Sequence, residues 1–88
     1  MERKELFEGL TRIISPYVGD KEALASATEN SHLLTDLKIN SSHLVDVVLD
    51  AETQYNIVFT DDDLEKLSTI GSCLDIVEEK LAANAGGQ

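Results

Sequence analysis

The chain has 88 residues with 17 acidic and 7 basic side chains, so its formal net charge is −10 at pH 7. This length makes one small domain, and 42% apolar residues are too many for a disordered acidic tail. The negative charge argues against binding to nucleic-acid phosphates or anionic membrane surfaces, and it favours basic protein partners.

The sequence also argues against disulfide, redox and membrane-spanning classes. Cys73 is the only cysteine, which excludes an internal disulfide and any CxxC metal or redox motif. The first residues are charged, and no segment approaches the roughly 20 apolar residues that a membrane helix needs. We therefore expect a cytoplasmic protein that does not insert into membranes.

The first element in chain order is an amphipathic helix predicted over about residues 3–15, or as far as 18. Apolar side chains recur there at steps of three and four residues, which places them on one helix face. Pro16 disfavours helical geometry at the preceding serine, so the helix is expected to end or bend there. The apolar face consists of Leu6, Phe7, Leu10, Ile13, Ile14 and Tyr17.

A long segment without sustained periodicity follows over residues 19–40. A loop of this length is unusual in a small domain and is often functional. A short helical turn near residues 21–27 is compatible with the sequence. We expect four apolar side chains to hold the loop against the core, namely Leu33, Leu34, Leu37 and Ile39.

Three further helices are predicted in the second half of the chain. The first runs over about residues 41–55, and Asn56 is expected at its left-handed end. The next is short: it opens at Thr60, a good N-cap followed by three acids, and ends near residue 67. The last runs from residue 68 or 69 to about residue 83. The apolar stripe of the earlier helix is Leu44, Val47, Val48, Ala51 and Tyr55, and that of the last is Ile70, Cys73, Leu74, Val77 and Leu81.

The expected fold is all-α, a four-helix bundle with a long loop between the first two helices and a short third helix. A single domain is expected over residues 1–83, with a flexible tail over residues 84–88. Residues 22–88 contain thirteen acids and three bases, so the whole net negative charge belongs to that part of the chain.

Few side chains indicate catalysis or metal binding. His32 and His43 lack the spacing of a zinc site, and the sequence has neither a Gly-x-Ser-x-Gly motif nor a phosphate-binding glycine loop. The acids of residues 61–65 alternate like the start of a calcium loop, but Lys66 occupies the position that needs glycine. We assign no catalytic residue and no metal ligand, and a calcium-binding helical protein is kept as an alternative.

The most informative segment is residues 36–46, where the long loop delivers a serine pair to the start of an acidic helix. Serines at helix starts are usually caps. Free backbone N–H groups and the positive end of the helix dipole would also stabilise a phosphate ester on Ser41.

This segment resembles the acyl carrier protein family, in which the pattern Asp-Leu-Gly-x-Asp-Ser-Leu opens an acidic second helix. The chain has DLKINSS at residues 36–42. The similarity continues without a gap through VDVV at 45–48, DDDLEKL at 61–67 and STIG at 68–71, and it covers residues 36–81. The resemblance thus implies a four-helix bundle of the acyl-carrier type, which agrees with the all-α bundle expected from periodicity.

The resemblance implies that Ser41 is the attachment point of a covalent 4′-phosphopantetheine arm. Only this serine lies four residues after Leu37 and four before Val45, as the family spacing requires. A phosphopantetheinyl transferase would use coenzyme A and Mg²⁺ to place the arm, whose terminal thiol would carry acyl groups as thioesters. The chain would be a monomeric carrier that performs no chemistry of its own.

The resemblance also implies a docking surface for acyl-loading and acyl-transfer enzymes with basic patches. Charge would set the approach while a small apolar patch supplies contact, so binding is expected to be weak and fast. The implied contact residues are Asn40, Leu44, Val45, Asp46, Leu49 and Asp50, with Phe59 and Asp61 from the next segment.

Several residues depart from the family pattern. Lys38 replaces the usual Gly, Asn40 replaces the usual Asp, and Ser42 and His43 replace an apolar residue and its neighbour. Such changes alter surfaces that partner enzymes contact, which favours a carrier of a specialised lipid or secondary-metabolite pathway over the housekeeping carrier of fatty acid biosynthesis. The alternative function is an unmodified acidic helical module that binds a basic partner.

Overall fold

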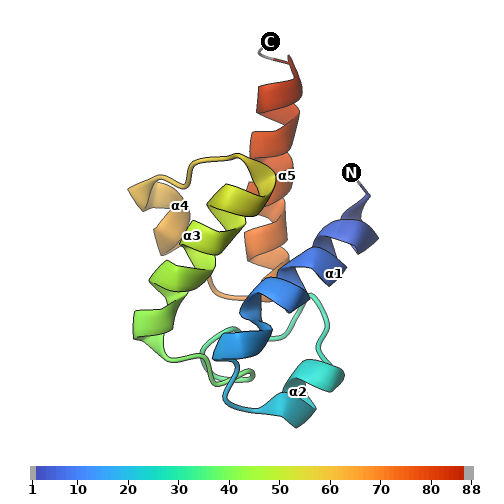
Figure 1. Cartoon of the computed structure of the whole chain (residues 1–88), viewed down its shortest axis with the longest axis vertical. Coiled ribbons are helices and arrows are strands. Elements are labelled where there is room, and N and C mark those ends of the chain that lie inside the picture. The colour runs from blue at the N-terminus through green and yellow to red at the C-terminus, as the bar shows by residue number, and fades with distance from the viewer. Residues whose placement is uncertain (1, 87–88) are drawn as a thin grey trace.

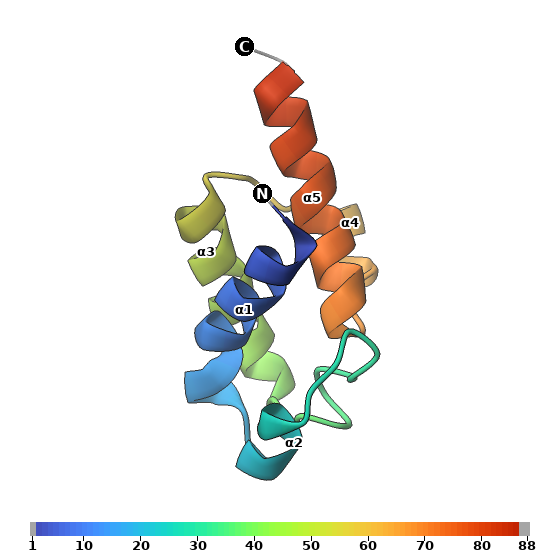
Figure 2. The ribbon, with the colours of Figure 1, turned by 90° about the vertical axis from the view of Figure 1, so that its right-hand side faces the viewer.

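Seven helical elements make up the described part of the chain. The computed structural model describes residues 2–86, with side chains over residues 2–83. The long helices α1, α3 and α5 form the main body, and α4 lies beside α3 (Figure 1). In the turned view of Figure 2, α1 lies across the space between α3 and α5. The elements are α1 (Arg3–Ile14), η1 (Ser15–Tyr17), α2 (Lys21–Ala25), η2 (Ser41–His43), α3 (Leu44–Tyr55), α4 (Asp61–Glu65) and α5 (Ile70–Gly86), where η denotes a 3-10 helix.

The predicted all-α fold is confirmed. The four predicted helices correspond to α1, α3, α4 and α5, and α2 is the short helical turn expected in the long loop. Pro16 changes the course of the first helix, because α1 ends at Ile14 and the chain continues as the 3-10 turn η1. Asn56 ends α3 in the left-handed conformation with φ 55°, as predicted.

The end of the last helix differs from the prediction. Helix α5 continues to Gly86, so residues 84–86 of the predicted tail belong to the helix. The alanine-rich sequence after residue 81 has high helix propensity, which accounts for the extension. Residues 87 and 88 of that tail lie outside the described residues.

The apolar stripes predicted for the three long helices meet in one core. Leu44 and Leu81 are half-buried at its margin, and the other stripe residues of α3 and α5 are buried. Burial also raises the pKa of the Cys73 thiol to about 12. The fully buried large side chains of the core are Leu6, Leu10, Ile14, Leu33, Leu37, Ile70, Leu74 and Val77.

Three of the four apolar side chains expected to hold the long loop against the core are buried there, and the fourth is exposed. Leu33, Leu37 and Ile39 are buried as predicted, whereas the prediction for Leu34 is wrong because this side chain is 36% exposed. Leu34 lies in a turn in which the amides of Asp36 and Leu37 both donate to the carbonyl of His32. This turn directs consecutive side chains to different sides, so two adjacent leucines cannot both face the core.

Backbone hydrogen bonds join this loop to the start of α5. The amide of Leu33 donates to the carbonyl of Ser68 (2.8 Å), and the amide of Ile70 donates to the carbonyl of Ser31 (3.0 Å). The amide of Gly71 donates to the carbonyl of Glu29 (2.8 Å), and a Cβ at Gly71 would meet that same carbonyl oxygen at 3.0 Å. The close approach therefore favours glycine at this position.

An ionic cluster around Arg3 reinforces the same junction. Its guanidinium contacts carboxylates of Glu29 (2.6 Å), Glu78 (2.6 Å) and Asp75 (2.9 Å), and it donates to the carbonyl of Gly71 (3.1 Å). Hydrogen bonding to Arg3 lowers the pKa of Glu29. One cation thus connects α1, the long loop and α5.

The short helix α4 is stabilised by a capping box at its N-terminus and by an ion pair to α5. The Thr60 hydroxyl accepts a hydrogen bond from the amide of Asp63 (3.2 Å), and the Asp63 carboxylate accepts one from the amide of Thr60 (2.8 Å), which completes a capping box. The same carboxylate forms an ion pair with Lys80 of α5 at 2.7 Å. The N-cap predicted at Thr60 is confirmed.

No helix within residues 2–86 is both long enough and apolar enough to cross a membrane.

The Asp63 interactions predict an acid-sensitive part of the stability. Hydrogen bonds from Lys80 and from the Thr60 amide lower the pKa of Asp63 from its ordinary 3.8 to about 2. Because the folded-state pKa is the lower one, the carboxylate stabilises the fold above pH 4, and this contribution is lost as the pH falls from about 4 to 2. We expect Asp63→Asn to reduce the free energy of unfolding at pH 7 by about 1–2 kcal/mol.

Urea unfolding of the wild type and Asp63→Asn at pH 7, 4 and 2 measures this contribution. The difference between the two proteins is expected to shrink between pH 4 and pH 2. The matched control is Asp62→Asn, which changes an exposed carboxylate in the same helical turn. A difference that is as large at pH 2 as at pH 7 would contradict the assignment.

Candidate functional site

Ser41 lies exposed at the first position of η2, directly before α3. Asn40 is the N-cap, and its side-chain oxygen accepts hydrogen bonds from the amide of Ser42 (3.0 Å) and from the hydroxyl of Ser42 (2.9 Å). In the described part of the chain the Ser41 hydroxyl has no hydrogen-bond partner. The two adjacent serines therefore differ, since one hydroxyl is engaged in capping and the other is available.

Two buried residues on either side of Lys38 fix the loop that leads to Ser41. Leu37 and Ile39 are buried, and the amide of Ile39 donates to the carbonyl of Leu33 (3.1 Å). Lys38 between them has φ 58°, in the left-handed region. The amide of Gly19 donates to the carbonyls of Leu37 (3.1 Å) and Lys38 (3.2 Å), which holds this turn in place.

Two contacts of Tyr17 join η1 to η2 and to α3. The Tyr17 ring lies 5.4 Å from the His43 ring, centroid to centroid, with a tilt of 47°. The Tyr17 hydroxyl donates to the Asp50 carboxylate at 3.0 Å, and this hydrogen bond raises the pKa of Tyr17. The sequence indicates only that Tyr17 lies on an apolar helix face, and no sequence signal connects it with residues more than 20 positions away.

The residues predicted for docking separate into two groups. Leu44, Val45, Leu49 and Phe59 line one pocket, in which Val45 and Leu49 are 60% and 53% exposed. Phe59 is only 8% exposed, so its ring forms part of a pocket wall instead of projecting from the surface. The polar members of the predicted set lie exposed outside this pocket, and they are Asn40, Asp46, Asp50 and Asp61.

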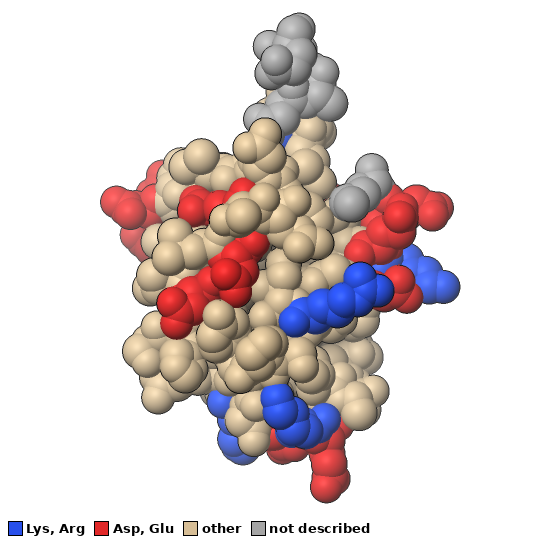
Figure 3. Space-filling model, viewed as in Figure 1, with Lys and Arg blue, Asp and Glu red and all other residues tan. Residues whose placement is uncertain are grey.

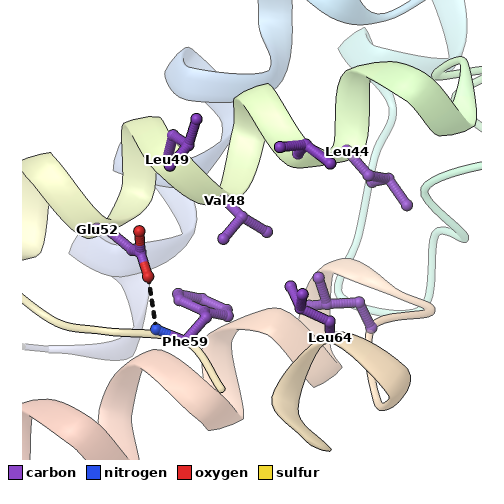
Figure 4. A pocket seen from close by; sticks show the side chains of 8 residues that line it. Leu44, Val48, Leu49, Glu52, Phe59 and Leu64 are labelled. Atoms are coloured by element: carbon purple, nitrogen blue, oxygen red, sulfur yellow. Dashed lines mark hydrogen bonds between the residues drawn. The ribbon is translucent and has the colours of Figure 1, made fainter. Parts of the chain in front are cut away.

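The pocket between α3 and α4 has a volume of about 300 Å³. Figure 4 shows side chains of both helices pointing into it, with Glu52 as the polar member of its lining. The Glu52 carboxylate accepts a hydrogen bond from the amide of Phe59 at 2.7 Å. Leu64 is not among the predicted site residues, although an apolar residue between the acids at 61–65 is a usable sequence signal. The complete lining is Leu44, Val45, Val48, Leu49, Glu52, Phe59, Leu64 and Leu67.

Charge is distributed unevenly around this site. On the face shown in Figure 3, acidic side chains lie over α3 and α4, whereas basic and acidic side chains are mixed over α1 and at the end of the molecule near α2. Among the described residues, no group of three or more His, Cys, Asp or Glu side chains could hold a metal ion. Asp63, the middle acid of the candidate calcium segment, is paired with Lys80.

Sequence comparison provides independent information about the family. No protein-family model matches the chain. The chain is 39% identical to an acyl carrier protein of Thermotoga maritima over 79 residues, which are 90% of this chain and 95% of that protein. It is 33% identical to an acyl carrier protein of Coprothermobacter proteolyticus, with 92% and 96% covered, and 32% identical to one of Guillardia theta, with 94% and 100% covered.

The left-handed residue before the site leads to a stability prediction. The left-handed conformation at φ 58° costs about 1–2 kcal/mol for a residue with a Cβ, and glycine would remove this cost. Glycine also raises the entropy of the unfolded chain, which offsets part of the gain. We expect Lys38→Gly to raise the free energy of unfolding by up to about 1 kcal/mol. Lys38→Ala is the matched control, because it removes the charge but keeps the Cβ. Equal stabilities of the two variants in urea unfolding would show that backbone conformation is not the cause.

Proposed function

The chain belongs to the acyl carrier protein family, whose members are carrier proteins rather than enzymes, and from this premise we propose that it carries acyl groups as thioesters on a 4′-phosphopantetheine arm attached to Ser41. The observation that carries this proposal is the available hydroxyl of Ser41 beside the engaged hydroxyl of Ser42. The family spacing selects the same serine.

The surroundings of Ser41 fit a phosphodiester. Its position at the start of η2 and α3 places it at the positive end of the helix dipole. The exposed side chain of Lys38 contributes a cation three residues away in sequence. When a phosphopantetheinyl transferase attaches the arm from coenzyme A, these groups would stabilise the negative charge of the new ester.

The pocket between α3 and α4 fits the acyl chain. Seven of its eight lining residues are apolar, and Leu44, the first residue of α3, marks the end of the lining that is nearest to Ser41 in sequence. A chain on the arm would enter from this end and lose contact with water. Each methylene group buried in the pocket would stabilise the bound chain by about 0.8 kcal/mol. The cargo would thus be sheltered without a new covalent bond.

The exposed side of α3 fits a docking surface for the transferase and for acyl-loading and acyl-transfer enzymes. Val45 and Leu49 supply a small apolar patch beside Asp46. Tyr17 contacts two residues near this patch: its hydroxyl donates to the Asp50 carboxylate, and its ring packs against the His43 ring. The negative charge of Asp50 is therefore fixed in place by this contact. This composition differs from an evenly acidic helix, which supports a carrier with dedicated partners in a specialised lipid or secondary-metabolite pathway.

The attachment site is tested by intact mass measurement. We expect the apo-protein, incubated with coenzyme A, Mg²⁺ and a promiscuous phosphopantetheinyl transferase, to gain the mass of one arm. Ser41→Ala is expected to abolish the gain, and Ser42→Ala is expected to retain it. A gain that persists in Ser41→Ala would refute the assigned serine, and no gain with several transferases would favour the unmodified interaction module.

The docking surface is tested by a pair of charge reversals. Asp46→Lys changes an exposed acid on the proposed docking side of α3, and Glu79→Lys makes the same change on α5. We expect the first to slow loading by the transferase roughly three- to ten-fold at low salt, since one surface charge pair contributes about 1 kcal/mol. Equal rates for both variants in a loading time course would argue against docking through α3.

A further inference from the structure

Lys38 is an exposed cation on a strained backbone, three residues before Ser41. Its φ of 58° lies in the left-handed region, which a residue with a Cβ adopts only where the surrounding structure holds it. Gly19 provides this restraint, because its amide donates to the carbonyl of Lys38 (3.2 Å) and a Cβ at Gly19 would meet that carbonyl oxygen at 2.7 Å. Tight backbone packing therefore sets the place from which the lysine side chain projects.

No acid within the described side chains neutralises this lysine. Among residues 2–83, the Lys38 ammonium has neither an ion pair nor a hydrogen bond. Asp36, two residues earlier, accepts a hydrogen bond from the amide of His32 (2.7 Å). Asp20, which follows the packed glycine, caps α2 by accepting one from the amide of Ala23 (3.1 Å). Lys38 is thus available to a group outside the molecule.

The partner that must come close to Lys38 is the phosphopantetheinyl transferase. Enzymes that act on the thiol end of the arm meet the protein at a distance set by the arm. The transferase, in contrast, must bring the Ser41 hydroxyl within bonding range of the phosphate of coenzyme A. It therefore covers the residues on both sides of Ser41, where it meets Lys38 in the loop and the exposed Asp46 on α3.

These two opposite charges set a requirement on the surface of the transferase. Basic side chains opposite Asp46 are attracted, but basic side chains opposite Lys38 are repelled. An evenly basic docking patch is therefore penalised at one end, whereas a patch that ends in a carboxylate gains at both ends. A repulsive element of this kind discriminates between partners more sharply than attraction alone.

We propose that Lys38 is a specificity-determining residue, which pairs with a carboxylate on the transferase of this carrier and disfavours transferases with an evenly basic docking patch. The inference rests on the proposed carrier function and specifies the chemistry of one partner. It concerns the encounter before the arm is attached, when Ser41 carries no phosphate that could occupy the ammonium. The positive charge before Ser41 and the negative charge after it also fix the direction in which α3 crosses the enzyme.

A charge series at position 38 tests this contact with two transferases. One is the transferase that loads the protein in its native source, and the other is a promiscuous transferase of another organism with an evenly basic docking patch. The KM for the apo-protein is measured at low salt for the wild type, Lys38→Arg, Lys38→Gln and Lys38→Glu. Each variant keeps a Cβ at φ 58°, so the series changes charge at a constant backbone cost.

We expect the two transferases to respond in opposite directions. With the native transferase, Lys38→Glu is expected to raise KM roughly five- to ten-fold with little change in kcat, Lys38→Gln to raise it less, and Lys38→Arg to stay close to the wild type. With the evenly basic transferase, Lys38→Glu is expected to lower KM by a similar factor. Both effects should fade at about 0.5 M salt, because salt screens exposed charges.

The matched control is Lys4→Glu, which reverses an exposed lysine in the first turn of α1 and is expected to leave both KM values unchanged. The proposal requires responses of opposite sign in Lys38→Glu. A rise in KM with both transferases would show that Lys38 serves a phosphate of coenzyme A, and it would overturn the proposed carboxylate. An absent response with either transferase would overturn it as well.

Carbodiimide coupling identifies the group opposite Lys38. The reagent joins a lysine amine to a carboxylate as an amide and takes up the water that is released. We expect the complex with the native transferase to yield a link from Lys38 to an Asp or Glu of the enzyme, and we expect Lys38→Arg to lose it. A complex that is coupled through Asp46 and enzyme lysines but never through Lys38 would contradict the proposal.

The outcomes separate this inference from the function on which it rests. If neither transferase loads the wild type, the carrier function itself fails, and the proposed contact fails with it. If both load the wild type but KM does not depend on the charge at position 38, the carrier function stands and the proposed contact is refuted.

Discussion

The position of Ser41 depends on the antiparallel contact between the long loop and the start of α5. The backbone bonds between Leu33 and Ser68 and between Gly71 and Glu29 fix the base of the loop, and the buried side chains of Leu37 and Ile39 continue its attachment to the core. Arg3 adds an ionic connection from α1 to the same junction. An irregular segment that is fixed at its base in this way can present an exposed residue at a defined place, which a free loop cannot do.

The acidic side chains of this protein serve two different purposes. Asp63, Glu29 and Glu78 form ion pairs that join parts of the fold, so these acids serve the structure of the molecule. Asp46 is exposed beside the proposed attachment serine and stays available for attracting a partner. The net charge of −10 already includes Arg3 and Lys80, so the field that a docking enzyme meets depends on where the remaining acids lie.

Periodicity and capping predicted the helices well because both are local properties of the chain. The start of α4 at Thr60 and the left-handed end of α3 at Asn56 follow from residue types within one turn. The errors and omissions involve contacts between distant segments. Leu34 was placed in the core because an aperiodic loop offers no rule for choosing between adjacent leucines, and the bond between Tyr17 and Asp50 joins residues whose proximity only the fold creates.

The buried position of Cys73 has a consequence for a protein that would carry thioesters. A thioester is exchanged by attack of a thiolate, and a reactive cysteine in the same molecule would compete for the cargo at high effective concentration. Burial raises the pKa of the Cys73 thiol well above its ordinary value, which disfavours the thiolate at pH 7, and the core around it blocks approach. The fold would thus keep its own sulfur from intercepting an acyl group in transit.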